Sequence, residues 1–181
     1  GSDSFTYVAS DGDLESNVGT ISIEITAIND APVVSDITTQ SVDEDNVFTY
    51  TVVASDIDGD NLDYSAESNG NSVVTIEDNL LTVTPDTDYN GDILLTVTVS
   101  DGQYSDSDEF TLTVTAVNDA PIVSQPIEDL QLSEDSEAAT IDLDPVFTDV
   151  DNVGLAYSVS LSADGIIAAE VNSSILTLTT L

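Results

Sequence analysis

The fold of this chain is decided by the run Ile93-Leu94-Leu95-Thr96-Val97-Thr98-Val99-Ser100. Apolar side chains occupy every second position from Ile93 to Val99, and polar residues separate the later ones. Period-two alternation rich in Val, Ile and Thr predicts a half-buried antiparallel strand. After a turn at Asp101-Gly102, the alternation resumes through Phe110, Leu112 and Val114. The two runs therefore predict a β-hairpin with one apolar face.

Similar short runs fill the rest of the chain, and no stretch keeps a helical period over three turns. Asp-Gly and Asn-Gly pairs, which favour turns, separate the runs. These pairs are Asp11-Gly12, Asp58-Gly59, Asn69-Gly70, Asn90-Gly91, Asp101-Gly102 and Asp164-Gly165. We therefore expect an all-β protein.

Repeated segments divide the chain. Asn29-Asp30-Ala31-Pro32 recurs 89 positions later as Asn118-Asp119-Ala120-Pro121, which is the spacing of a domain. Other segments recur at similar offsets: Ser10-Asp11-Gly12 with Ser100-Asp101-Gly102, Ile21/Ile23/Ile25 with Phe110/Leu112/Val114, Asp56-Ile57-Asp58 with Asp149-Val150-Asp151, and residues 80–84 with 175–179. The chain is thus expected to be a set of related modules.

Residues 30–118 are predicted to form one complete module, residues 1–29 the last two strands of an incomplete one, and residues 119–181 the first five strands of a third. About seven strands in about 90 residues is the size of an immunoglobulin-like β-sandwich. In the complete module we expect strands near 33–42, 46–54, 62–67, 72–77, 80–84, 92–100 and 108–117.

The charge is unusually one-sided. The 181 residues include 36 Asp and Glu but no Lys, Arg or His, so the formal net charge is −36. Nucleic acid is excluded as a direct partner because no side chain can neutralise phosphate, and anionic membrane surfaces are disfavoured for the same reason. No apolar run is long enough to insert into a bilayer. Self-repulsion on this scale must be relieved by solvent cations.

Catalysis is not expected. General acid–base chemistry near neutral pH draws mainly on His, Lys, Cys or a carboxyl with a raised pKa, and the first three are absent. Carboxylate pairs of the kind used by glycosidases are present, but they lie in loops. There is also no Trp to hold a sugar ring.

The acidic residues are predicted to collect at the two ends, or poles, of the complete module. Strands alternate in direction, so successive loops lie at opposite ends. The near pole is predicted to contain Asn29, Asp30, Asp56, Asp58, Asp60 and Asp101. The far pole is predicted to contain Glu44, Asp45, Asp86, Asp88, Asn118 and Asp119, next to Asp149 and Asp151 of the following module.

These sets predict calcium sites at the joints between modules. Calcium takes six to eight oxygen ligands, and this chain offers only oxygen. Facing carboxylates without basic partners would repel one another unless a cation lay between them. Two alternatives remain open. The acids could be ordinary turn residues, or Asp56, Asp58, Asp60 and Glu67 could form an EF-hand-like loop, although its Gly is at the fourth place rather than the sixth.

The joint motif, the upstream Ser-Asp-Gly and the run Thr84-Pro85-Asp86-Thr87-Asp88-Tyr89-Asn90-Gly91 together resemble bacterial cadherin-like tandem repeats. Such repeats occur in very large calcium-dependent surface adhesins and matrix proteins. The resemblance implies tandem seven-stranded Greek-key sandwiches, an extracellular or cell-surface location and rods stiffened by calcium. One departure is Asp86-Thr87-Asp88, which stands where cadherins have an acidic triplet and leaves the number of ions per joint open.

The expected function is therefore that of a structural or adhesive spacer whose partners are neighbouring repeats or copies. The alternative is a module that binds carbohydrate, protein or another surface or matrix ligand, but no aromatic-rich insertion favours it. In the repeat alignment Gly1 matches Gly91 and Leu181 matches Asp86. Three explanations stay open: a window of a longer rod, an expression fragment in which Gly1-Ser2 comes from a vector, or donor-strand complementation, in which residues 1–29 complete residues 119–181 of a neighbour.

Overall fold

The structure, a computed structural model, describes residues 1–162 and 165–181. Those residues form strands and contain no helix that could cross a membrane. The predicted turn at Asp164-Gly165 includes Asp164, which lies outside the described residues. Contacts divide the chain into two compact units, residues 1–114 and 115–181. The predicted divisions after Asn29 and Asn118 stay predictions.

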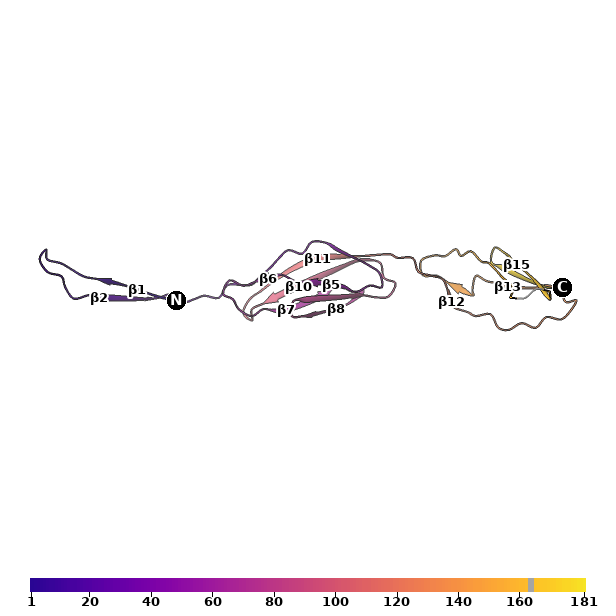
Figure 1. The fold of residues 1–181 in the computed structure, drawn as a ribbon, viewed down its shortest axis with the longest axis horizontal. Coiled ribbons are helices and arrows are strands. Elements are labelled where there is room, and N and C mark those ends of the chain that lie inside the picture. The colour runs from indigo at the N-terminus through magenta and orange to yellow at the C-terminus, as the bar shows by residue number, and fades with distance from the viewer. Residues whose placement is uncertain (163–164) are drawn as a thin grey trace. The chain divides into compact units, whose positions relative to one another are not determined.

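The first unit begins with a hairpin that is a two-stranded sheet of its own. Strands β1 (Ser2–Tyr7) and β2 (Gly19–Glu24) pair antiparallel, with Phe5 opposite Ile21. The Tyr7 ring lies beside Gly19, in the space that a Cβ at that position would take. Large apolar side chains remain exposed, including Phe5 at 51% and Ile23 at 44%. The hairpin, whose strands are labelled in Figure 1, is therefore formed but leaves its apolar side chains exposed.

The rest of this unit, the central module, has a four-stranded sheet as one layer. The order is β4-β11-β10-β7, with β10 and β11 forming the long hairpin predicted from the alternating runs. Leu95 is opposite Phe110 in this pair. Figure 1 labels three of these strands, β7, β10 and β11. Their bounds are Gln40–Asp43 for β4, Asp63–Ser68 for β7, Gly91–Ser100 for β10 and Ser105–Thr115 for β11.

The second layer contains the remaining strands. One three-stranded sheet has the order β5-β9-β8, and a short pair joins β3 to β6. The core between the layers is made of alternate side chains from both, including the fully buried Leu81, Val97 and Leu112. The all-β prediction is confirmed. The bounds are Val33–Val34 for β3, Phe48–Thr51 for β5, Ala54–Ser55 for β6, Ser72–Glu77 for β8 and Leu80–Pro85 for β9.

The strand predicted at 33–42 is in fact two strands in different sheets, β3 and β4. Val34 and Ile37 are both 6% exposed although they are three positions apart, so one regular strand could not bury both. The crossing segment is held by two carboxylates of β11. The N–H of Val34 donates to Asp106 at 2.9 Å, and that of Ile37 donates to Asp108 at 2.6 Å.

The second unit repeats part of this arrangement. A pair β12–β14 corresponds to β3–β6, and a sheet β13-β16-β15 corresponds to β5-β9-β8. Its described residues form no strand at the positions that correspond to β4 and β7. The third of the five strands predicted for residues 119–181 corresponds to β7 and is therefore not formed in the described residues. In the central module those two strands pair with β11 and β10. The bounds are Ile122–Val123, Ala139–Asp142, Phe147–Thr148, Ile167–Asn172 and Ile175–Thr180 for β12 to β16.

Candidate metal centre

The loop after β6 contains the tightest acidic cluster of the near pole. One carboxylate oxygen from each of Asp56, Asp58 and Asp60 lies within 4.8 Å of the others. Asp56 Oδ1 accepts the N–H of Asp58 at 2.8 Å, of Gly59 at 3.0 Å and of Asp60 at 3.3 Å. Its other oxygen, Oδ2, is buried and has no hydrogen-bond partner. The loop is folded around one carboxylate that still has a free acceptor.

The joint residues are tied to this end of the module. The N–H of Asp30 donates to Asp58 Oδ2 at 2.8 Å. The amide of Asn29 donates to Asp101 Oδ2 at 2.8 Å and to the carbonyl of Asp30 at 3.0 Å. The structure therefore brings all six residues predicted for the near pole to one end, linked by hydrogen bonds or by the acidic cluster.

Both carboxylate oxygens of Asp101 accept hydrogen bonds. Its Oδ1 accepts the N–H of Tyr104 at 2.7 Å and that of Gln103 at 2.6 Å. These bonds, that of Tyr104 first, hold the pKa of Asp101 below its ordinary value, and the Asn29 amide acts in the same direction. Asp11 in the N-terminal hairpin has a lowered pKa for the same reason, with Leu14 and then Asp13 as donors. In both Ser-Asp-Gly segments, the Asp side chain therefore holds the turn that follows it by accepting backbone N–H groups.

The second unit repeats the geometry of the joint. The N–H of Asp119 donates to Asp151 Oδ2 at 2.6 Å, as Asp30 does to Asp58. Asp149 Oδ1 accepts the N–H of Asp151 at 3.0 Å. Asn152, which the sequence analysis missed, donates through its side chain to Asn118 Oδ1 at 3.0 Å. Its place after Asp-x-Asp, where the central module has Gly59, is the only sequence signal for it.

The acids predicted for the far pole of the central module occupy two loops. Asp45 Oδ1 accepts the N–H of Asp88 at 3.1 Å, so these loops are joined. The N–H of Tyr89 donates to the carbonyl of Asp86 at 3.1 Å. Glu44 is only 3% exposed, and Asn90, also missed from the sequence, donates to it at 3.5 Å. Asn118 and Asp119, predicted for the same pole, belong to the second unit.

The donor set fits a hard divalent cation. Every side chain at the near pole offers oxygen, and Asp56 Oδ2 is a buried oxygen without a hydrogen bond. No basic side chain exists to neutralise these groups. The EF-hand alternative does not fit, because Glu67 is an exposed residue of β7, opposite Thr96 of β10. A side chain in a sheet strand cannot close an EF-hand loop.

A protein-family model matches most of the central module. The model of the family described as "Bacterial Ig domain" matches residues 29–115. The prediction of an immunoglobulin-like β-sandwich is confirmed by this match and by the strands described above. The match supports the immunoglobulin-like fold in general. A comparison with curated proteins finds no match.

Comparison with solved structures finds weak similarity to several chains. Titin domain M7 is 20% identical, with a TM-score of 0.37, and the match covers 50% of this chain and 100% of that one. An endo-fucoidan hydrolase of glycoside hydrolase family 107, MfFcnA4, is 20% identical, with a TM-score of 0.40 and coverage of 99% and 29%. A nucleoside hydrolase-related hypothetical protein from Saccharophagus degradans is 18% identical, with a TM-score of 0.43 and coverage of 48% and 26%. The chain spans under a third of the length of these two hydrolase-related chains.

Proposed function

We propose that this chain is a non-catalytic structural segment of an extracellular or cell-surface adhesin or matrix protein. The match to a bacterial Ig domain supports a structural or adhesive role, and the repeated joint supports a tandem arrangement. The cadherin-like sequence features favour the calcium-dependent kind of rod. Neighbouring repeats or copies of the same protein are the proposed partners.

Calcium at the poles is the proposed source of stiffness. The single observation that carries this proposal is the buried, unpartnered Oδ2 of Asp56 within the cluster of three aspartates. A cation there would neutralise charge and link the loop after β6 to Asn29 and Asp30, which already contact the same loop and Asp101. Asn118, Asp119, Asp149 and Asp151 are proposed as the corresponding set in the second unit, and Glu44, Asp45, Asp86 and Asp88 as the far-pole set.

Calcium titration of the EDTA-treated chain tests this proposal. Extracellular calcium modules bind with dissociation constants of about 10⁻⁴–10⁻³ M. At about 1 mM calcium each such site would stabilise the folded state by roughly 0.4–1.4 kcal/mol. We expect binding heat in calorimetry, and an increase of about 5 °C in the melting temperature of the central module. An unchanged melting temperature together with no binding heat would refute the calcium sites.

Two substitutions locate the site. Asp56→Asn keeps an oxygen for the loop N–H groups but removes the charge, and should weaken calcium binding by about tenfold. Glu67→Gln is the matched control, because it removes one charge from an exposed position of β7. An equal loss of calcium affinity in both variants would show that binding depends on the net charge of the chain, and would argue against a specific site at Asp56.

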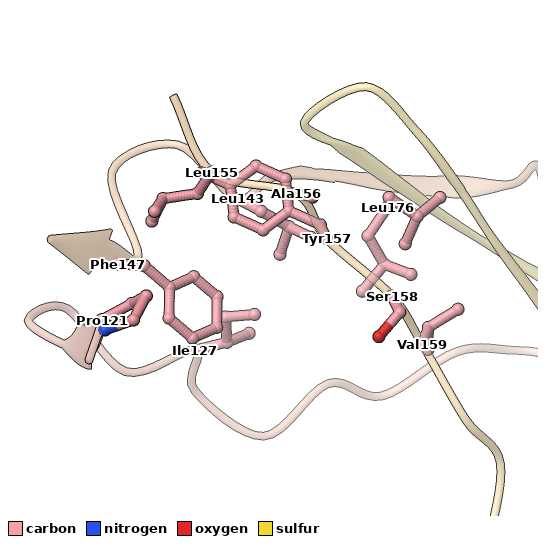
Figure 2. A pocket seen from close by; sticks show the side chains of 11 residues that line it. Pro121, Ile127, Leu143, Phe147, Leu155, Ala156, Tyr157, Ser158, Val159 and Leu176 are labelled. Carbon is pink, nitrogen blue, oxygen red and sulfur yellow. The ribbon is translucent and has the colours of Figure 1, made fainter. Parts of the chain in front are cut away.

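Copies of the chain are also proposed to join through strand complementation. The support is the combination of an uncovered hairpin in the first unit with an open apolar face in the second (Figure 2). Head-to-tail joining of this kind does not close on itself and so produces a filament. Chain mass measured against concentration by light scattering should rise if copies join, and a constant monomer mass would contradict the joining.

A further inference from the structure

We infer that Asn69 is a site of spontaneous deamidation, in which the backbone nitrogen of Gly70 closes a ring on the Asn69 side chain and releases ammonia. The pair lies in the turn between β7 and β8 of the central module, two strands labelled in Figure 1. A second Asn-Gly pair, Asn90-Gly91, precedes β10 and serves as an internal comparison. The inference goes beyond the proposed structural role and depends neither on calcium nor on the joining of copies.

The reaction needs only the chain and water. The N–H of Gly70 loses its proton, and the nitrogen attacks the side-chain carbonyl carbon Cγ of Asn69, which closes a five-membered succinimide ring. The bond from Cγ to Nδ2 breaks, and Nδ2 leaves as ammonia with the proton that Gly70 lost. Water then opens the ring: attack at Cγ gives aspartate, and attack at the backbone carbonyl carbon gives isoaspartate, whose chain continues through the former side chain.

The side-chain oxygen of Asn69 is held by a backbone donor. The N–H of Leu94 in β10 donates to Asn69 Oδ1 at 3.1 Å, and the N–H of Asn69 donates to the Leu94 carbonyl at 3.0 Å. Negative charge develops on Oδ1 when the nitrogen attacks Cγ, and a positioned N–H group stabilises such charge. The two bonds also restrict the motion of the Asn69 side chain before the reaction begins.

The attacking nitrogen is not engaged elsewhere. The N–H of Gly70 donates no hydrogen bond to any residue that the structure describes, so its deprotonation breaks no bond within that part of the chain. Gly70 has a φ of +130°, which favours glycine, and a Cβ built there would meet no atom within 4 Å apart from its chain neighbours. The turn therefore has room for the ring on this side.

The second Asn-Gly pair lacks these features. The side-chain amide of Asn90 donates to Glu44 Oε2 at 3.5 Å, and among the described residues no group donates to its own Oδ1. The negative charge of Glu44 opposes the negative charge that the attack would place on the Asn90 side chain. Gly91 is the first residue of β10, and a Cβ built there would lie 3.0 Å from the Tyr89 hydroxyl. The fold therefore favours reaction at Asn69 over reaction at Asn90.

Isoaspartate at position 69 would loosen one end of the pairing between β7 and β10. The pairing ends with Ser68 opposite Leu95, and the two bonds between Asn69 and Leu94 extend it by one residue. Isoaspartate adds a methylene to the backbone, so both bonds cannot keep their present lengths. Aspartate keeps the backbone and an acceptor oxygen, and should preserve them.

Incubation of the folded chain in mildly alkaline buffer, followed by digestion with a protease that cuts after Glu, tests the inference. Cuts at Glu67, Glu77 and Glu109 place Asn69 in residues 68–77 and Asn90 in residues 78–109. Mass spectrometry detects the replacement of NH₂ by OH in each peptide. Asn69 should react about ten times faster than Asn90 in the folded chain, which corresponds to a barrier lower by about 1.4 kcal/mol.

The same measurement in concentrated urea is the control, because both sites are then unfolded Asn-Gly pairs and their ratio of rates corrects for the flanking residues. In Asn69→Gln the attack would have to close a larger ring, so the mass change in residues 68–77 should disappear. Hydrogen exchange of the Leu94 amide should be about tenfold faster in the aged chain than in Asn69→Asp, which has a backbone of ordinary length. Equal rates at Asn69 and Asn90 after the urea correction, or a mass change that persists in Asn69→Gln, would overturn the inference.

Discussion

Asp101 accepts a 2.8 Å hydrogen bond from the side-chain amide of Asn29, which lies 72 positions earlier in the chain. This bond fastens the joint to the loop between β10 and β11. Asn29→Ala should therefore destabilise the central module by about 1 kcal/mol, the usual net value of such a bond. Urea unfolding followed by tyrosine fluorescence would measure the change. Asn61→Ala, at an exposed position, is the control and should change stability by less than about 0.5 kcal/mol.

Acid should weaken the loops held by Asp101 and Asp11. Hydrogen bonds from backbone N–H groups lower the pKa of both carboxyls, so their contribution is present above the unfolded value of about 3.9. It is lost as the pH falls through the lower, folded pKa. Carbon-13 NMR of the carboxyl groups should find both titrating below 3.9. A titration of Asp101 at or above that value would contradict the hydrogen-bond assignment.

Equivalent positions in the two hairpins should respond differently to truncation. Leu112 is completely buried in the central module, so Leu112→Ala should cost roughly 2–5 kcal/mol of unfolding free energy. Ile23 occupies the matching place in β2 but is 44% exposed. In dilute solution, Ile23→Ala should leave the unfolding of the central module within about 0.5 kcal/mol of the unsubstituted chain. Similar losses of unfolding free energy in both variants would show that the apolar side chains of the hairpin β1–β2 are already buried in dilute solution.

The carboxylates of Asp106 and Asp108 should contribute measurably to stability. Each accepts a backbone N–H from the segment between β3 and β4, at a partly buried site. Replacing either by Ala leaves an N–H without its charged acceptor, which should cost about 1.5–3 kcal/mol. Asp→Asn should recover part of the loss because the amide oxygen still accepts. Thermal unfolding of the four single variants would test this, and a neutral Ala substitution would show that water replaces the carboxylate.

Much of the fold could be predicted from alternation alone. The β10–β11 hairpin is confirmed, because Leu95, Val97 and Leu112 follow period two without interruption. The predicted strand at 33–42 was wrong in detail, since Val34 and Ile37 are spaced for a crossing between sheets. That odd spacing was visible in the sequence.

Other features depended on tertiary partners and could not be read locally. Apolar and polar residues alternate around Tyr157 as they do around Tyr64. The described residues of the second unit, however, form no strand that pairs with them. Counting strand directions predicts that the loop acids of the near pole lie at one end, and the structure places them there, while their role as metal ligands stays a prediction. Which of their oxygens would remain unpartnered, as in Asp56, depends on how the loop turns.

The two bonds of Asp106 and Asp108 also bear on how the module carries mechanical load. The chain enters the module next to Val34 and leaves it through β11. A force that pulls the two ends of the module apart is therefore transmitted from the segment between β3 and β4 to β11 through these two hydrogen bonds. The apolar core does not lie on that path. Asp106 and Asp108 then contribute to resistance to stretching as well as to thermal stability, whereas the apolar core contributes mainly to thermal stability.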